Sequence, residues 1–189
     1  VKYGVEKEAP AGVPFLVFGL SEFDCSDKGA ALPAAAAAAL PLIQKGDFRG
    51  KRLQTALVYP NGNGPERLFL VGLGDPTDLD VQTFRRLGGK GGRKAQELGV
   101  SHMAMQLPPE SGADVVAAAT QGAILGSLCA KKKEKDPAVE SITVWGGGGS
   151  DDAVQVGTAV AEATQYARML VAEPPNMLYP ATLGEEVEG

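Results

Sequence analysis

Short apolar runs alternate with longer segments of helical periodicity along most of the chain. The runs are bounded by Gly, Pro or polar residues and predict five strands, at residues 15–18, 55–59, 67–72, 103–107 and 141–145. The turn-rich segment 60–65 joins the second and third of these strands, so this pair is predicted to form a β-hairpin.

Four segments between and after the strands predict helices. An alanine-rich helix is expected from residue 34 to about 44, kinked or shortened by Pro41. A second helix, capped by Thr77 or Asp78, has one face made of Val81, Phe84, Gly88, Gly91, Ala95 and Leu98. A third is expected from about 114 to 130, with a face made of Val115, Ala118, Gly122, Leu125 and Cys129. The last begins after Ser150 or Asp151, ends before Pro174, and has an apolar stripe made of Val156, Val160, Ala163, Ala167 and Leu170.

Strands that alternate with helices, together with one hairpin, predict an α/β fold. The expected architecture is a three-layer domain in which helices cover both faces of a mixed β-sheet. Glycines inside a helix are unfavourable, so Gly88 and Gly91 predict close packing of their helix on the sheet. The stripe of the last helix is predicted to pack on the same sheet.

Composition and charge argue against several classes of protein. The chain has 189 residues and a formal net charge of −5, the wrong sign for a module that holds nucleic acid through phosphate contacts. It has no apolar run of 18 residues, as a membrane span would need. Cys25 and Cys129 are far apart in sequence, which argues against a disulfide scaffold and a zinc knuckle and favours a reducing compartment.

Two glycine-rich segments have features of phosphate-binding turns. Gly72-Leu73-Gly74 lies between a strand and a helix, but the third glycine of a dinucleotide turn is missing. Asp75 adds negative charge there and Pro76 removes a backbone donor, so a plain turn is favoured. Residues 88–94, GGKGGRK, lack phosphate-loop spacing and lie inside a helical pattern, which favours packing.

Single residues with reactive side chains also favour structural roles. His102 is the only histidine and lies in no metal-binding or triad motif. Asp151-Asp152 is interpreted as a helix cap, the two cysteines as small buried residues, and residues 131–133, KKK, as a solvated helix end. The sequence therefore predicts no catalytic, cofactor-binding or metal-binding residue in this chain.

Residues 167–183, ARMLVAEPPNMLYPATL, resemble the stretch that joins the two domains of leucyl aminopeptidases in the cytosol aminopeptidase family. The family pattern is Ala-Arg-x-Leu-Val-Asn-x-Pro-x-Asn-x-Leu-x-Pro, and Ala172 stands where the pattern has Asn. Further segments agree in order, namely residues 47–51, 70–74, 84–89 and 121–126. Residues 127–129 depart from the aromatic residues that family members often have there.

The resemblance implies a fold, a domain division and a function. Residues 1–170 would form the family's N-terminal domain, which is similar in fold to macro domains, and residues 171–189 the interdomain junction and the truncated start of the catalytic domain. The Lys, Asp and Glu ligands of the family's two divalent metals, Zn or Mn, would lie beyond Gly189. The chain would then be a non-catalytic part of a cytoplasmic, hexameric metallo-aminopeptidase that removes N-terminal residues such as leucine from peptides. Its expected partners are its own catalytic domain and other subunits, with no membrane or nucleic acid among them.

A second interpretation stays open at this point. A macro-like fold also suits a free-standing module that binds ADP-ribose or a nucleotide, although a fold alone is a weak guide to function. The chain starts at Val1 rather than Met, which we interpret as a processed or excised product. The intact mass and metal content of the native gene product would separate the two interpretations.

Overall fold

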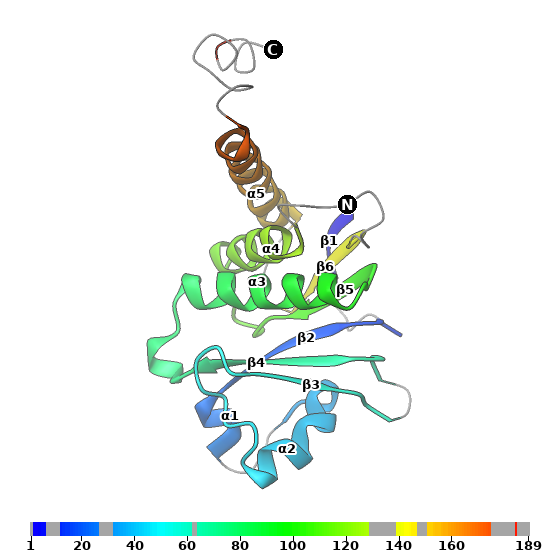
Figure 1. Ribbon diagram of the computed structural model, residues 1–189. Coiled ribbons are helices and arrows are strands. Elements are labelled where there is room, and N and C mark those ends of the chain that lie inside the picture. Colours follow the sequence, from blue (N-terminus) through cyan, green and yellow to red (C-terminus); the bar gives the residue numbers. More distant parts are fainter. Residues whose placement is uncertain are drawn as a thin grey trace.

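A six-stranded mixed sheet forms the centre of the described part of the chain (Figure 1). The computed structural model describes residues 2–6, 12–26, 32–61, 64–128, 139–146, 151–174 and 184. The strand order is β1-β6-β5-β2-β4-β3, for strands β1 Lys2–Glu6, β2 Leu16–Ser21, β3 Thr55–Val58, β4 Leu68–Gly74, β5 His102–Gln106 and β6 Ser141–Trp145. All neighbouring strands are parallel except β3, which runs antiparallel to β4. The predicted hairpin and mixed sheet are confirmed.

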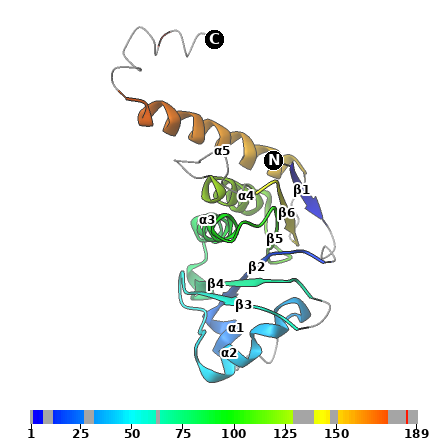
Figure 2. The same cartoon turned by 45° about the vertical axis from the view of Figure 1, so that its right-hand side comes forward.

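Helices cover both faces of this sheet, which confirms the predicted three layers. One layer contains α3 Val81–Glu97, α4 Ala113–Ser127 and α5 Asp151–Ala172. The opposite layer contains α1 Glu22–Ser26, the 3-10 helix η1 Ala34–Ala39 and α2 Leu40–Lys45, with Pro41 in the first turn of α2. A second 3-10 helix, η2 Pro76–Asp78, precedes α3. Figure 2 shows the two layers on either side of the strands.

The core is split into two clusters because the central strands are buried on both faces. Along β2, Val17 packs under α3 and α4, whereas Leu16 and Phe18 point to the layer of η1 and α2. The same alternation continues in β4, where Phe69 and Val71 point to the face of the sheet that α3 and α4 cover. Successive side chains of a strand point to opposite faces, so an unbroken apolar run fills both clusters.

Strand β1 was not predicted from the sequence. It forms an edge of the sheet and pairs in parallel with β6, so that Lys2 lies opposite Ser141. A five-residue segment with little apolar character has no local signal for a strand. Its partner strand lies far away in the sequence and can be recognised only in the folded chain.

The glycines of α3 correct one expectation and confirm another. Gly91 faces the sheet as predicted, since a Cβ there would come within 2.6 Å of a Val17 methyl carbon. Gly88, which was also expected to meet the sheet, instead lies against the backbone of α4, where a Cβ would overlap the carbonyl oxygen of Ala119.

The predicted cap of α3, Thr77 or Asp78, was also wrong. The cap is Asp80, whose carboxylate accepts a hydrogen bond of 2.7 Å from the Thr83 amide.

The buried face of α5 differs from the predicted one. Its buried residues are Ala153, Val154, Gly157 and Ala161, which lie in the half of the helix that packs on α4 and β1. In the predicted stripe, Val156 is 57% exposed and Val160 is 46% exposed. The prediction that this stripe packs on the sheet is therefore wrong. Both faces are apolar, but the face with small residues permits closer approach, because Gly157 lies directly against the Ala117 carbonyl oxygen.

Candidate functional site

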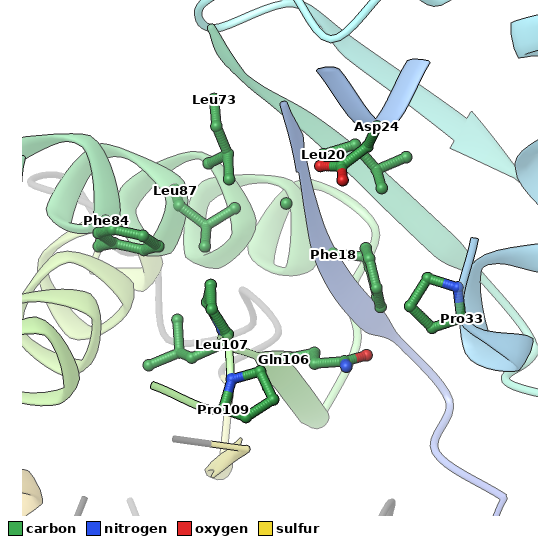
Figure 3. Close-up of a pocket in the computed structure, with 12 residues that line it drawn as sticks. Phe18, Leu20, Asp24, Pro33, Leu73, Phe84, Leu87, Gln106, Leu107 and Pro109 are labelled. Atoms are coloured by element: carbon green, nitrogen blue, oxygen red, sulfur yellow. The ribbon is translucent and has the colours of Figure 1, made fainter. Parts of the chain in front are cut away.

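An apolar pocket of about 200 Å³ lies at the carboxyl ends of β2, β4 and β5 (Figure 3). Figure 3 shows Phe84, Leu87 and Leu107 on one side of it and Phe18 and Pro33 on the other. Helix α1, which follows β2, lies on one face of the sheet, whereas α3 and α4, which follow β4 and β5, lie on the other. Such a divergence of connections leaves a crevice beyond the strand ends, which is where α/β proteins commonly bind ligands.

Two polar side chains line this pocket. One oxygen of the Asp24 carboxylate accepts hydrogen bonds of 2.7 Å from both the amide and the hydroxyl of Ser21. The side-chain oxygen of Gln106 is buried and has no hydrogen-bond partner within the described ranges. None of the described residues that line the pocket is Lys, Arg or His. Sequence reasoning missed this site, because its walls come from three separate strand ends and two helices.

The Gly72-Leu73-Gly74 turn has a structural explanation. Gly72 lies in close contact with the segment before β3, since a Cβ there would overlap the Lys51 carbonyl oxygen. Gly74 has φ of +88°, a left-handed conformation that favours glycine. Beyond it, the Asp75 carboxylate accepts hydrogen bonds from the Thr77 amide at 2.8 Å and the Thr77 hydroxyl at 2.7 Å. These hydrogen bonds lower the pKa of Asp75, so a negative charge occupies the position that a phosphate would need.

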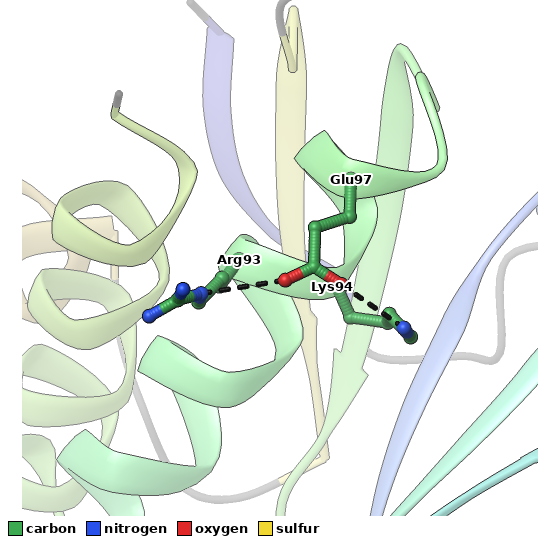
Figure 4. Close-up of polar contacts among 3 residues, drawn as sticks. All are labelled: Arg93, Lys94 and Glu97. Carbon is green, nitrogen blue, oxygen red and sulfur yellow. Dashed lines mark hydrogen bonds and ion pairs between the residues drawn. The ribbon is translucent and has the colours of Figure 1, made fainter. Parts of the chain in front are cut away.

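The GGKGGRK segment lies entirely inside α3, which confirms the packing interpretation. Its two last cations are engaged with one carboxylate at the end of the helix (Figure 4). Glu97 lies 3.3 Å from the Arg93 Nε and 3.0 Å from the Lys94 Nζ. The hydrogen bond from Lys94 is the main cause that lowers the pKa of Glu97. This part of the chain therefore has the geometry of a helix end rather than of a phosphate loop.

His102 has a partner that the sequence did not reveal. The parallel register of β5 and β6 places it opposite Ser141, and its Nδ1 lies 2.6 Å from the Ser141 hydroxyl. The pair is at the start of both strands, at the opposite end from the pocket. Within the residues that the structure describes, no carboxylate forms a hydrogen bond with this pair, so it has the form of a structural contact rather than of a triad.

The remaining reactive residues do not converge on one site. Asp151 and Asp152 are exposed in the first turn of α5. Burial, with Asp24 and Glu22 nearby, raises the pKa of the half-buried Cys25 thiol to about 11, which makes it a poor nucleophile. Cys129 and residues 131–133 lie outside the described residues. Among the described residues, no group of three or more His, Cys, Asp or Glu side chains could hold a metal ion.

The sequence profile of the N-terminal domain of the cytosol aminopeptidase family matches residues 17–129, which is more than half of the chain. The chain belongs to this family. The match includes the central strands, α3, α4 and the residues on every wall of the pocket.

Curated relatives of this cytosol aminopeptidase domain agree with the assignment. A probable cytosol aminopeptidase of Roseiflexus castenholzii is 35% identical over 161 residues, which are 76% of this chain and 32% of the relative. A probable cytosol aminopeptidase of Synechococcus sp. (strain CC9605) is 31% identical over 92% of this chain and 37% of the relative. A chloroplastic neutral leucine aminopeptidase of Solanum lycopersicum is 30% identical over 75% of this chain and 27% of the relative. The chain thus spans about a third of the length of these relatives.

Solved structures show the same fold at lower identity. A tomato leucine aminopeptidase mutant has a TM-score of 0.77 and 21% identity, with the whole of this chain and 41% of that chain covered. The bottromycin maturation enzyme BotP has a TM-score of 0.70 and 23% identity, with 94% of this chain and 36% of that chain covered. These likenesses confirm the predicted α/β fold.

No helix in the described ranges is long and apolar enough to cross a membrane.

Proposed function

We propose that this chain is the non-catalytic N-terminal domain of a leucyl aminopeptidase, with residues 1–170 forming the domain and 171–189 the junction to a catalytic region. The observation that carries the proposal is the match of residues 17–129 to the N-terminal domain of the family. The relatives are about three times as long as the region they share with this chain. A further region of that size is sufficient for a catalytic domain.

The reaction itself belongs to that further region. In the whole protein, two divalent metals, Zn or Mn, would supply Lewis-acid chemistry for removing N-terminal residues such as leucine from peptides. The described residues of this chain do not fit such a metal site, because no three potential ligands lie together among them. We therefore assign no catalytic step to this chain.

The exposed face of α5 is the surface that we assign to the partner. Val156, Val160 and Val171 are 57%, 46% and 87% exposed, and their helical spacing places them on one side of α5, with the exposed Ala163 and Ala167 between them. A contiguous apolar surface of this kind is typical of an interface. We propose that the catalytic region of the same polypeptide covers it, and that the whole protein assembles with other subunits into a hexamer in the cytoplasm.

Activity measurements test the catalytic part of this proposal. Neither this chain nor its mixture with Mn²⁺, Zn²⁺ or Co²⁺ should hydrolyse a leucyl chromogenic substrate, whereas the longer native gene product should do so after metal loading. Mass spectrometry of the native product should give a mass about three times that of this chain. Turnover that copurifies with this chain alone, or a native product of the same mass as the chain, would contradict the proposal.

A substitution on α5 tests the partner surface separately. Val160→Asp should leave the thermal stability of this chain almost unchanged, because the side chain is already half exposed. In the longer protein the same substitution should lower the melting temperature, because a carboxylate would be buried in the interface. Equal and small effects in both proteins would show that another surface contacts the catalytic region.

A further inference from the structure

We propose that the pocket at the carboxyl ends of β2, β4 and β5 is a binding site for a small neutral molecule with an apolar body and one hydroxyl or amide group. The proposal does not depend on the aminopeptidase assignment, because it rests only on residues of this domain. The pocket is separate from the exposed face of α5, since no α5 residue is among those that line it.

The position of the pocket follows from the topology. Neighbouring strands β2 and β4 send their chains to opposite faces of the sheet, to α1 and α3 respectively. Side chains on these diverging segments cannot fill the space between them, so a hollow remains above the strand ends. Gly19 in β2 lines this space, and the Leu73 side chain packs directly against it, since a Cβ at Gly19 would come within 3.0 Å of Leu73.

The size and the walls define the body of the ligand. A volume of about 200 Å³ is somewhat larger than an apolar cavity of about 150 Å³ that takes up benzene. It is below the range of about 300–1,000 Å³ that is usual for larger ligands such as a dinucleotide. Phe18, Leu73, Phe84 and Leu87 make the walls apolar. A single aromatic ring or a branched aliphatic group therefore fits.

The polar groups define what the ligand carries. The buried oxygen of Gln106 has no hydrogen-bond partner in the described chain, and buried polar groups are normally paired. The last side-chain torsion of glutamine is broad, so the amide can present either its oxygen or its nitrogen to the pocket. A hydroxyl or amide group on the ligand can donate a hydrogen bond to the Gln106 side-chain oxygen or accept one from the Gln106 side-chain nitrogen. The Asp24 carboxylate and the lack of a lining cation disfavour anions.

Phenol and toluene form a matched pair of probes, because they have nearly the same size and the hydroxyl group of phenol replaces the methyl group of toluene. Titration of this chain, followed by backbone amide chemical shifts, should show both probes shifting residues of β2, β5 and α3. The ratio of phenol affinity to toluene affinity should be about fivefold higher in the unmodified chain than in Gln106→Leu, the factor expected for one neutral hydrogen bond. Benzoate, which has a similar body and a negative charge, should bind more weakly than either.

Two variants and one control make the test specific. Gln106→Leu should lower the ratio of phenol affinity to toluene affinity, whereas Gln82→Leu on the exposed side of α3 should leave this ratio unchanged. Leu73→Phe, which fills the pocket from β4, should weaken both probes. Shifts that fail to map to the pocket, or an unchanged ratio of phenol to toluene affinity in Gln106→Leu, would each overturn the proposal.

Discussion

Replacing Gly88 by Ala should destabilise the domain, although alanine is the better helix former. Gly88 lies in the middle of α3 and faces α4 within the most extensive helix–helix contact of the described chain. A Cβ at this position would overlap the carbonyl oxygen of Ala119 and lie 2.8 Å from the Ala123 nitrogen. Both atoms belong to the backbone of α4, so no side-chain rotation can make room and the two helices must separate.

The magnitude follows from two opposing effects. Overpacking of a core costs typically about 1–3 kcal/mol, and an obstacle made of backbone places Gly88→Ala near the upper end. The gain in helix propensity from Gly to Ala offsets about 1 kcal/mol of this cost. The net loss in the free energy of unfolding is therefore about 2 kcal/mol, or a melting temperature lowered by roughly 4–8 °C for a domain of this size.

Gly89→Ala is the matched control, because it introduces the same methyl group one residue further along the same helix. The nearest atom outside the helix's own backbone is the Gly122 carbonyl oxygen at 3.6 Å from the added Cβ, an ordinary contact distance. This variant should therefore be stabilised by up to about 1 kcal/mol. Urea unfolding followed by circular dichroism measures both variants. Changes of the same sign for Gly88→Ala and Gly89→Ala would refute the argument that backbone contact with α4 decides the effect.

Three further predictions concern α5, the cap of α3 and nucleotide binding. Ala161→Asp should destabilise this chain by several kcal/mol, because Ala161 is fully buried. Val160→Asp should change the stability by no more than about 0.5 kcal/mol, because Val160 is half exposed. Similar melting temperatures for the two variants would contradict the observed orientation of α5. Hydrogen bonds from Thr83 lower the pKa of Asp80 below its ordinary value of 3.8, so the stability that this cap supplies is present above that value and is lost as the pH falls below it. Acid titration of Asp80→Asn should lack this part of the decline, and an unchanged acid profile would argue against the cap. Calorimetry with ADP-ribose should show binding weaker than a dissociation constant of about 10 μM, because the pocket is small and the Asp75 and Asp24 carboxylates repel phosphate. Tighter binding would favour a free-standing nucleotide-binding module.

Local patterns in the sequence were sufficient for most of the elements. The apolar run that forms β4 is flanked by turn residues, and its length alone distinguishes a strand from a helix. The hairpin of β3 and β4 follows from the turn-rich segment between them. The resemblance to leucyl aminopeptidases also came from the sequence alone, and the match to the family's N-terminal domain confirms it.

Only the tertiary structure decided which faces meet. α5 has two apolar faces with similar helical spacing, and periodicity cannot choose between them. The face with Gly157 is buried because its small residues allow the backbone of α5 to approach α4, whereas the larger Val160 is left outside. In the same way, Gln106 and Phe84 line one pocket only because their strand and helix ends converge. Sequence periodicity determines what each segment can bury, but the shapes of its neighbours determine what it does bury.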